Sequence, residues 1–249
     1  SWLIWKLTDG KVHATDTSNV SRTMLFNINS LRWDNELLDL FGINESSLPQ
    51  VKASNGDFGE TGKEASCGKG IPIRGIAGDQ QSSLFGHAAF SKGDAKNTYG
   101  TGSFILMNVG TESPKPVEGL LSTVAWTLEG DGTTTTTYAL EGSIFSTGAT
   151  VQWLRDGLGM ISEASELETL ALQCLDTGDV FIVPAFTGLG SPWWDPLARG
   201  ILLGITRGTG KAEIARAVIE SIAYQTRDVT EAMQIASNQQ LQNLRVDGG

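Results

Sequence analysis

The stretch that decides the fold runs from Gly200 to Ser237 and reads GILLGITRGTGKAEIARAVIESIAYQTRDVTEAMQIAS. From residue 211 onward its apolar residues recur mostly at steps of three and four, which predicts one long helix over 211–237 with a single buried stripe. The stripe comprises Ile214, Ala217, Val218, Ile222, Val229, Ala232, Met233 and Ala236. We therefore expect an α/β protein in which this helix packs against the core.

Shorter elements are predicted on both sides of this helix. Helices are expected over 149–160 and 165–172, and strands over 103–108, 180–183 and 244–249, of which 180–183 should be buried. The Thr-rich tract 133–137 follows a Gly-Asp-Gly turn and predicts a hairpin strand with a solvated face. A polar, turn-rich segment at 92–97 divides the chain, so we expect one domain over 1–91 and another over 92–249.

Composition excludes several classes of function. The 249 residues suffice for two domains, and their net charge of −10 disfavours a nucleic-acid partner. No window approaches the run of about 18 apolar residues that a membrane span requires, so we expect no membrane insertion. Cys67 and Cys174 are widely separated and His13 and His87 lack partners at ligand spacing, which predicts neither a disulfide framework nor a transition-metal site and fits a cytoplasmic protein.

Three predicted turns combine glycine with a polar or acidic residue. They are Gly78-Asp79, Gly100-Thr101-Gly102-Ser103 and Asp247-Gly248-Gly249. Glycine allows a ligand to approach the backbone closely, and the N–H groups of such turns suit phosphate. Each turn alone is equally compatible with an ordinary connection between strands, but together they indicate a nucleotide cleft.

Asp79 is the candidate for chemistry. It follows Ile71–Gly78, a strand-like run that closes on glycine, and it occupies the predicted N-cap of a helix. Its carboxylate could cap that helix, or it could accept the proton of a hydroxyl that attacks a phosphoryl group. The residues alone leave both roles open.

Several motifs resemble those of one enzyme family. Gly200–Ile205, followed after seven residues by Glu213-Ile214 and then by Ala217–Glu220, is similar to the C-terminal signature of the FGGY carbohydrate kinases. Four further motifs resemble the glycerol-phosphorylating branch of that family in order and spacing. These are Ile76–Gln81, Asn97–Gly102, Tyr138–Gly142 and Pro184–Pro196.

The resemblance implies an actin-like, ribonuclease-H-like pair of domains that close over ATP, Mg²⁺ and glycerol and form glycerol 3-phosphate. It implies that Asp79 is the catalytic base and touches the substrate beside Gln80, and that Phe104 packs on the carbon chain of glycerol. It further implies nucleotide contacts at Thr101, Gly148, Gln152 and Gly249, no metal held by protein side chains, and a homo-oligomeric parent enzyme.

The chain also departs from the family pattern. The first phosphate loop, part of the polyol clamp and the segment after Gly249 cannot be matched, so we expect an internal fragment with truncated domains that is inactive alone. The stretch Ser66–Ile71 lacks the arginine that binds fructose 1,6-bisphosphate in some relatives, which makes this regulation doubtful. The alternatives are a kinase of the same family for another polyol or sugar, an actin-like ATPase module, and a structural scaffold.

Overall fold

The computed structural model describes residues 1–248, and their contacts divide the chain into two compact units. Unit 1 comprises Ser1–Lys92, Asn108–Lys115 and Ser122–Leu140. Unit 2 comprises Gly93–Met107, Pro116–Leu121 and the chain from Glu141 onward. The predicted domain boundary after residue 91 stays a prediction, because a packing unit and a domain need not coincide.

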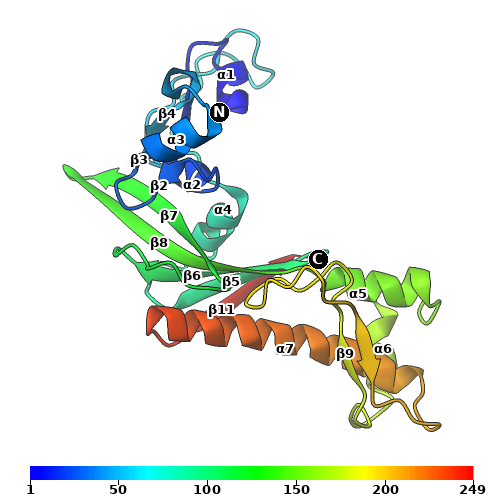
Figure 1. The fold of residues 1–249 in the computed structure, drawn as a ribbon. Coiled ribbons are helices and arrows are strands. Elements are labelled where there is room, and N and C mark those ends of the chain that lie inside the picture. The colour runs from blue at the N-terminus through cyan, green and yellow to red at the C-terminus, as the bar shows by residue number, and fades with distance from the viewer. Residues whose placement is uncertain (249) are drawn as a thin grey trace. The chain divides into compact units, whose positions relative to one another are not determined.

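Unit 1 combines short helices with two small sheets (Figure 1). In one sheet β1 pairs in parallel with β4, and in the other β2 pairs antiparallel with β3. Ile4 on α1, Ala14 on β1 and Phe58 form a buried cluster. The elements are α1 (Trp2–Leu7), β1 (Ala14–Asp16), α2 (Thr17–Val20), β2 (Phe26–Asn27), β3 (Arg32–Trp33), α3 (Asn35–Phe41), the 3-10 helix η1 (Glu45–Ser47), β4 (Gln50–Lys52) and α4 (Asp79–Gly86).

A five-stranded sheet has the order β11-β5-β6-β8-β7. The strands are β5 (Asp94–Tyr99), β6 (Ser103–Gly110), β7 (Leu121–Gly130), β8 (Thr133–Ile144) and β11 (Asn243–Gly248). The last of these pairs in parallel with β5, which pairs antiparallel with β6. The hairpin predicted before the Thr-rich tract is confirmed: Asp131 and Gly132 both have positive φ, as a tight hairpin turn requires. The strands predicted near residues 103 and 244 are confirmed as well.

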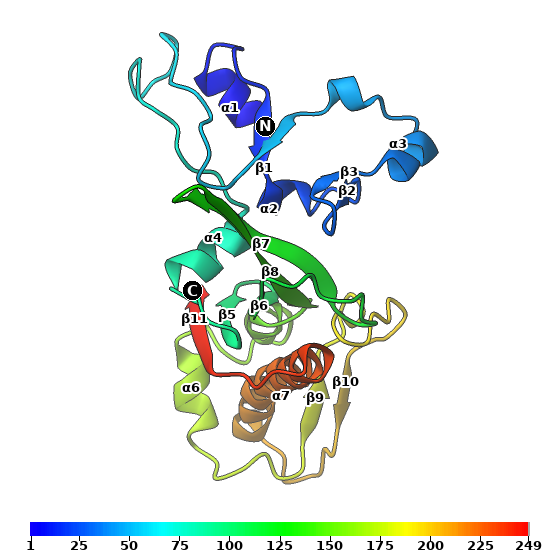
Figure 2. The ribbon, with the colours of Figure 1, turned by 90° about the vertical axis from the view of Figure 1, so that its left-hand side faces the viewer.

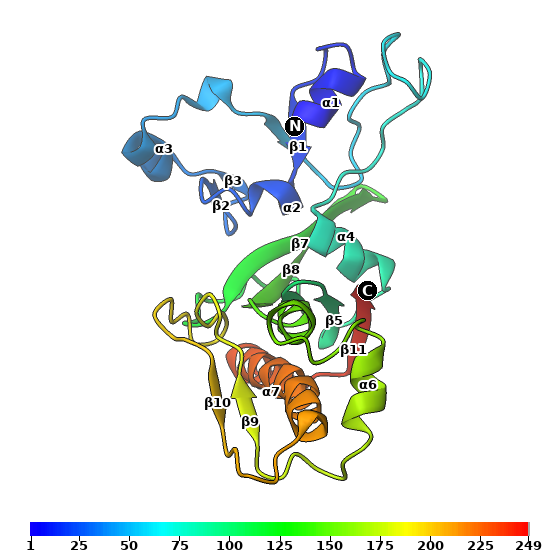
Figure 3. The same ribbon diagram turned by 90° about the vertical axis from the view of Figure 1, so that its right-hand side faces the viewer.

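The long helix α7 (Lys211–Ser237) is the main helix of unit 2, and it has the predicted bounds. The hydroxyl of Thr226 on α7 lies 3.3 Å from that of Tyr99 on β5. Figure 2 and Figure 3 show α6 (Glu166–Ala171) along one side of α7 and the strands β9 (Phe181–Val183) and β10 (Ile201–Leu203) along the other. Leu154, Val180 and Val218 belong to the buried cluster between these elements.

Three predicted elements differ from the structure. Ile71–Gly78 is not a strand, because its backbone hydrogen bonds go to the irregular segment 54–61 and form only one isolated bridge, between Pro72 and Glu60. The helix predicted over 149–160 is divided into α5 (Gly148–Gln152) and the π-helix η2 (Trp153–Gly157). In β9 only Ile182 is buried, because β9 belongs to a two-stranded sheet in which its neighbours point outward.

Candidate functional site

Asp79 is the first residue of α4, not its N-cap as predicted. Gly78 takes the N-cap position with an extended backbone, φ −62° and ψ 154°, so the Asp79 side chain begins one residue inside the helix. The side chain is exposed, and among residues 1–248 its carboxylate accepts one recorded hydrogen bond, from Gln80 Nε2 to Oδ2 at 3.1 Å. The carboxylate is therefore open to a ligand and does not cap the helix.

The segment that carries Asp79 is fixed through Gly78. Its backbone N–H donates to Ser18 Oγ at 2.9 Å. A Cβ atom at this position would lie 2.4 Å from Oε1 of Gln81, whose buried side chain donates from Nε2 to Thr123 Oγ1 at 3.1 Å. A larger residue here would displace the buried Gln81 side chain, so close packing at Gly78 and the Ser18 contact together hold the segment that carries Asp79.

A buried carboxylate that sequence reasoning missed supports Ser18. Asp16 is fully buried at the end of β1. It accepts hydrogen bonds from Ser18 N (3.0 Å), Ser18 Oγ (2.6 Å), Asn19 N (3.1 Å), Asn19 Nδ2 (2.7 Å) and Ser54 Oγ (2.8 Å). The Asp-Thr-Ser-Asn sequence is a helix N-cap pattern that could have revealed the local bonds, but the contact with Ser54 is visible only in the fold.

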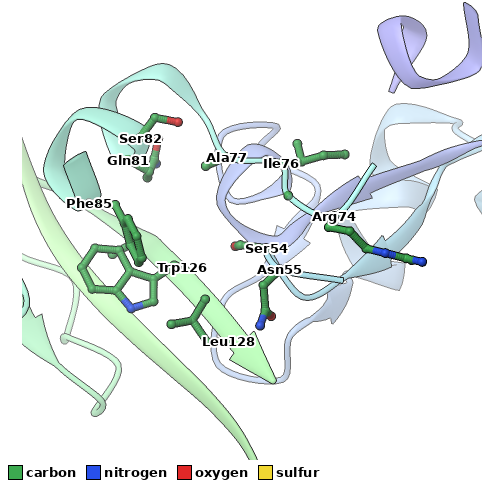
Figure 4. A pocket seen from close by; sticks show the side chains of 12 residues that line it. Ser54, Asn55, Arg74, Ile76, Ala77, Gln81, Ser82, Phe85, Trp126 and Leu128 are labelled. Carbon is green, nitrogen blue, oxygen red and sulfur yellow. The ribbon is translucent and has the colours of Figure 1, made fainter. Parts of the chain in front are cut away.

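A cavity of about 340 Å³ in unit 1 lies between the 74–77 segment, α4 and β7 (Figure 4). Phe85 and Trp126 lie side by side in it, with ring centroids 5.3 Å apart and an edge-to-face geometry. Arg74 lies at its other end and forms an ion pair with Asp57, which lowers the pKa of that carboxyl. Asp79 and Gln80 do not line this cavity, so the predicted polyol contacts lie outside it.

In unit 2 the turn between β5 and β6 is bonded to the start of α5. Gly148 N donates to Gly100 O and Ala149 N to Thr101 O, both at 3.0 Å. A Cβ atom on Gly148 would lie 2.5 Å from Gly100 O, so the two segments are in direct backbone contact. This contact places the two predicted nucleotide contacts Thr101 and Gly148 next to each other.

Two cavities share Gly100, Gly148 and Val151. One, of about 430 Å³, is also lined by Thr101, Gln152 and Arg155, so three of the predicted nucleotide contacts come together there. The other, of about 390 Å³, includes Thr147 and Gly248. Both volumes suit a small-molecule ligand. The fourth predicted contact, Gly249, lies outside the described residues.

Arg155 is a cationic group in the larger of these cavities that sequence reasoning missed. Its guanidinium donates to both carboxylate oxygens of Asp156, from Nε at 2.7 Å and from Nη2 at 2.9 Å. This pairing raises the pKa of Arg155 and lowers the pKa of Asp156. Asp156 therefore offsets the charge of Arg155, and the pair adds no net positive charge to the cavity.

Phe104 is the second residue of β6, and its side chain is 40% exposed. Its carbonyl oxygen accepts from Nζ of the fully buried Lys96 at 3.2 Å, which fixes the backbone at this point. Phe104 belongs to unit 2 with the nucleotide candidates, whereas Asp79 and Gln80 belong to unit 1. The structure therefore brings the predicted residues together as two separate groups.

The described residues show two further features. Within residues 1–248, no group of three or more His, Cys, Asp or Glu side chains could hold a metal ion. None of the helices described in this range has the length and apolar character needed to cross a membrane.

Family models match both parts of the chain. The model of the FGGY family of carbohydrate kinases, N-terminal domain, matches residues 1–86. The model of the FGGY family of carbohydrate kinases, C-terminal domain, matches residues 95–249. The two models together account for nearly every residue.

Individual relatives match the whole chain. Glycerol kinase 2 of Saccharolobus solfataricus is 58% identical and glycerol kinase of Carboxydothermus hydrogenoformans 56% identical, each over all 249 residues. These alignments cover 48% and 49% of the relatives' own lengths. The crystal structure of Plasmodium falciparum glycerol kinase with ADP superposes with a TM-score of 0.92 at 39% identity, covering 100% of this chain and 49% of that one. The chain thus spans about half the length of the relatives it matches.

Proposed function

Because the chain belongs to the FGGY family of carbohydrate kinases, we propose that it forms the part of an ATP-dependent glycerol kinase that carries the catalytic base and much of the nucleotide site. The observation that carries the proposal is the identity of 56–58% to glycerol kinases over every residue of the chain. The product is glycerol 3-phosphate. The exposed carboxylate of Asp79, which caps no helix, supports the same assignment.

Asp79 acts in this proposal as the general base. Oδ2 accepts from Gln80 and Oδ1 has no recorded partner among residues 1–248, so Oδ1 is available to the substrate hydroxyl. The hydroxyl transfers its proton to the carboxylate while its oxygen forms a bond to the γ-phosphorus, and the bond from that phosphorus to the bridging oxygen breaks and releases ADP. Such a base works mainly by orienting the nucleophile. Gln80 and the exposed ring of Phe104 contact the polyol.

Thr101, Gly148, Gln152 and Gly249 contact the nucleotide. The 430 Å³ cavity that the first three line supports this assignment. Mg²⁺ supplies charge neutralisation on the transferring phosphates, and in kinases it commonly binds to those phosphates with only one or two carboxylates. The lack of a multidentate acidic cluster in residues 1–248 is compatible with that mode of binding. We also propose a cytoplasmic, homo-oligomeric enzyme.

The test is a chimera in which this chain replaces the matching 48% of the Saccharolobus solfataricus relative. The chimera should form glycerol 3-phosphate from glycerol and ATP. Asp79→Asn should abolish turnover and leave the binding of glycerol and ADP intact, because only proton transfer is lost. Asp131→Asn is the matched control, since Asp131 is an exposed carboxylate in the β7–β8 turn and asparagine tolerates its positive φ.

Three results would contradict the proposal. Equal rates for Asp79→Asn and wild type would exclude the base assignment. A preference for another polyol or sugar over glycerol in a panel of substrates would show that the enzyme acts on a different substrate. ATP hydrolysis without any acceptor would indicate an ATPase module.

A further inference from the structure

The carbonyl groups of the Gly100–Gly102 turn all have recorded donors. Gly100 O accepts from Gly148 N at 3.0 Å and from Thr147 Oγ1 at 3.1 Å. Thr101 O accepts from Thr147 N and from Ala149 N, both at 3.0 Å. Gly102 O accepts from Gly100 N at 2.8 Å. The first two carbonyls therefore point toward the start of α5.

This arrangement fixes the direction of two backbone donors. The peptide bonds on both sides of Thr101 are trans, and in a trans peptide the N–H points opposite to the C=O. The N–H groups of Thr101 and Gly102 must therefore point away from α5, and the structure records no hydrogen bond from either. Two adjacent N–H groups that point the same way suit a phosphate oxygen.

Thr147 is the residue that makes this arrangement specific. Its side chain is 1% exposed, and its hydroxyl accepts from Ser103 Oγ at 3.1 Å while donating to Gly100 O. The side-chain oxygen of a threonine at a helix N-cap usually accepts a hydrogen bond from a backbone N–H of the first turn. Thr147 makes no such capping bond to α5. Thr147 thus contacts both ends of the turn through its side chain and the middle of the turn through its backbone.

We propose that Thr147 is a positioning residue for the nucleotide: it holds the turn so that the N–H groups of Thr101 and Gly102 meet a phosphate group. The proposal rests on the proposed kinase function and adds to it a residue that does not itself contact the ligand. Since the hydroxyl acts through Gly100 and Ser103, its loss affects the direction of the two donors more than the packing of the core.

The test compares three variants of the 249-residue chain. Thr147→Val keeps the shape and removes both side-chain hydrogen bonds, Thr147→Ser keeps the hydroxyl, and Ser103→Ala removes only the bond from Ser103. ADP affinity is measured by isothermal titration calorimetry, and backbone amide exchange of residues 99–103 by mass spectrometry. Thr147→Val should bind ADP about tenfold more weakly and exchange faster in the turn, and it should melt at a lower temperature because the buried Ser103 hydroxyl loses its acceptor. Thr147→Ser and Ser103→Ala should stay within about threefold of wild type.

The possible failures are distinguishable. If wild type binds ADP and Thr147→Val binds it equally well, the role of Thr147 is overturned and the nucleotide site stands. If Thr147→Ser is as weak as Thr147→Val, the hydroxyl is not responsible and the proposal is also overturned. If wild type does not bind ADP at millimolar concentration, the chain alone does not hold the nucleotide, and the same titrations are made in the chimera described above, where equal binding by Thr147→Val and wild type overturns the proposal.

Discussion

The hydroxyl of Ser18 and the backbone N–H of Gly78 are joined by a hydrogen bond of 2.9 Å that spans 60 residues of sequence. The same hydroxyl donates to the buried Asp16 at 2.6 Å. Ser18 thus connects a buried carboxylate to the residue immediately before the proposed base. The position of Asp79 depends on this connection as well as on α4.

Ser18→Ala should lower the free energy of unfolding by about 1–3 kcal/mol, because the Gly78 N–H loses its acceptor and Oδ2 of Asp16 loses one of its three hydrogen bonds. Urea denaturation of the chain measures the change. Ser46→Ala is the control, since Ser46 is exposed in η1, and it should differ from wild type by less than about 0.5 kcal/mol. If Ser18→Ala and Ser46→Ala lowered the free energy of unfolding equally, the Ser18 hydrogen bonds would not contribute to stability.

Asp16→Asn should also destabilise the chain, by about 1–3 kcal/mol. The carboxylate of Asp16 accepts five hydrogen bonds. In the variant, the NH₂ group of asparagine replaces one acceptor oxygen and would face N–H or O–H groups that are themselves donors. Thermal unfolding followed by circular dichroism reports the loss. A melting temperature equal to that of wild type would mean that the network reorganises around the amide.

Gly148→Ala should be destabilising, because the new methyl group would lie 2.5 Å from the carbonyl oxygen of Gly100 and one backbone segment must move. We expect a loss of about 1–3 kcal/mol together with weaker ADP binding. Gly86→Ala at the end of α4 is the matched control, since its Cβ meets nothing within 4 Å and it should be neutral or stabilising by up to about 1 kcal/mol. Similar losses in both variants would contradict the steric argument.

Asp228→Asn should raise the melting temperature at pH 7. Desolvation, with a smaller contribution from Glu231, raises the pKa of Asp228 above 3.8 in the folded chain. The folded state therefore binds this proton more tightly than the unfolded state, so the charged carboxylate costs stability as the pH rises through the folded pKa. Below about pH 3 both states are protonated and the advantage of the variant should vanish. An advantage that persists at low pH would have another cause.

The sequence predicted regular features well and contacts between distant residues poorly. The bounds of α7 are confirmed because 27 residues repeat one apolar pattern, and the family-specific motifs correctly indicated the actin-like, ribonuclease-H-like kinase fold. Ile71–Gly78 was wrong as a strand because a short apolar run does not determine pairing. The N-cap assignment of Asp79 was wrong by one residue, because the extended backbone that marks the N-cap lies at Gly78 and Asp79 is already helical.

In the candidate site, too, local motifs were predicted from the sequence and contacts between distant residues were not. Motifs indicated Thr101, Gly148 and Gln152, and the structure places these three around one cavity. The residues that support the candidate site could not be predicted, because their partners are far away in the sequence. Thr147 bonds to Gly100 across 47 residues beside the nucleotide candidates, and Ser54 bonds to Asp16 across 38 residues in the network that supports the Asp79 segment. Ordinary serine and threonine residues carry these contacts, and nothing in their local sequence distinguishes them.

The parallel pairing of β11 with β5 limits how early the sheet can be completed during synthesis on the ribosome. Asn243 Nδ2 donates to Asp94 Oδ1 at 2.8 Å across a separation of 149 residues. During synthesis β5 must therefore remain without this neighbour until the ribosome has added those residues, which takes roughly 7–30 s at about 5–20 residues per second. Throughout that interval one side of β5 is an unpaired strand edge and is exposed to association with other chains. Chaperone protection of the nascent chain is most valuable in that interval.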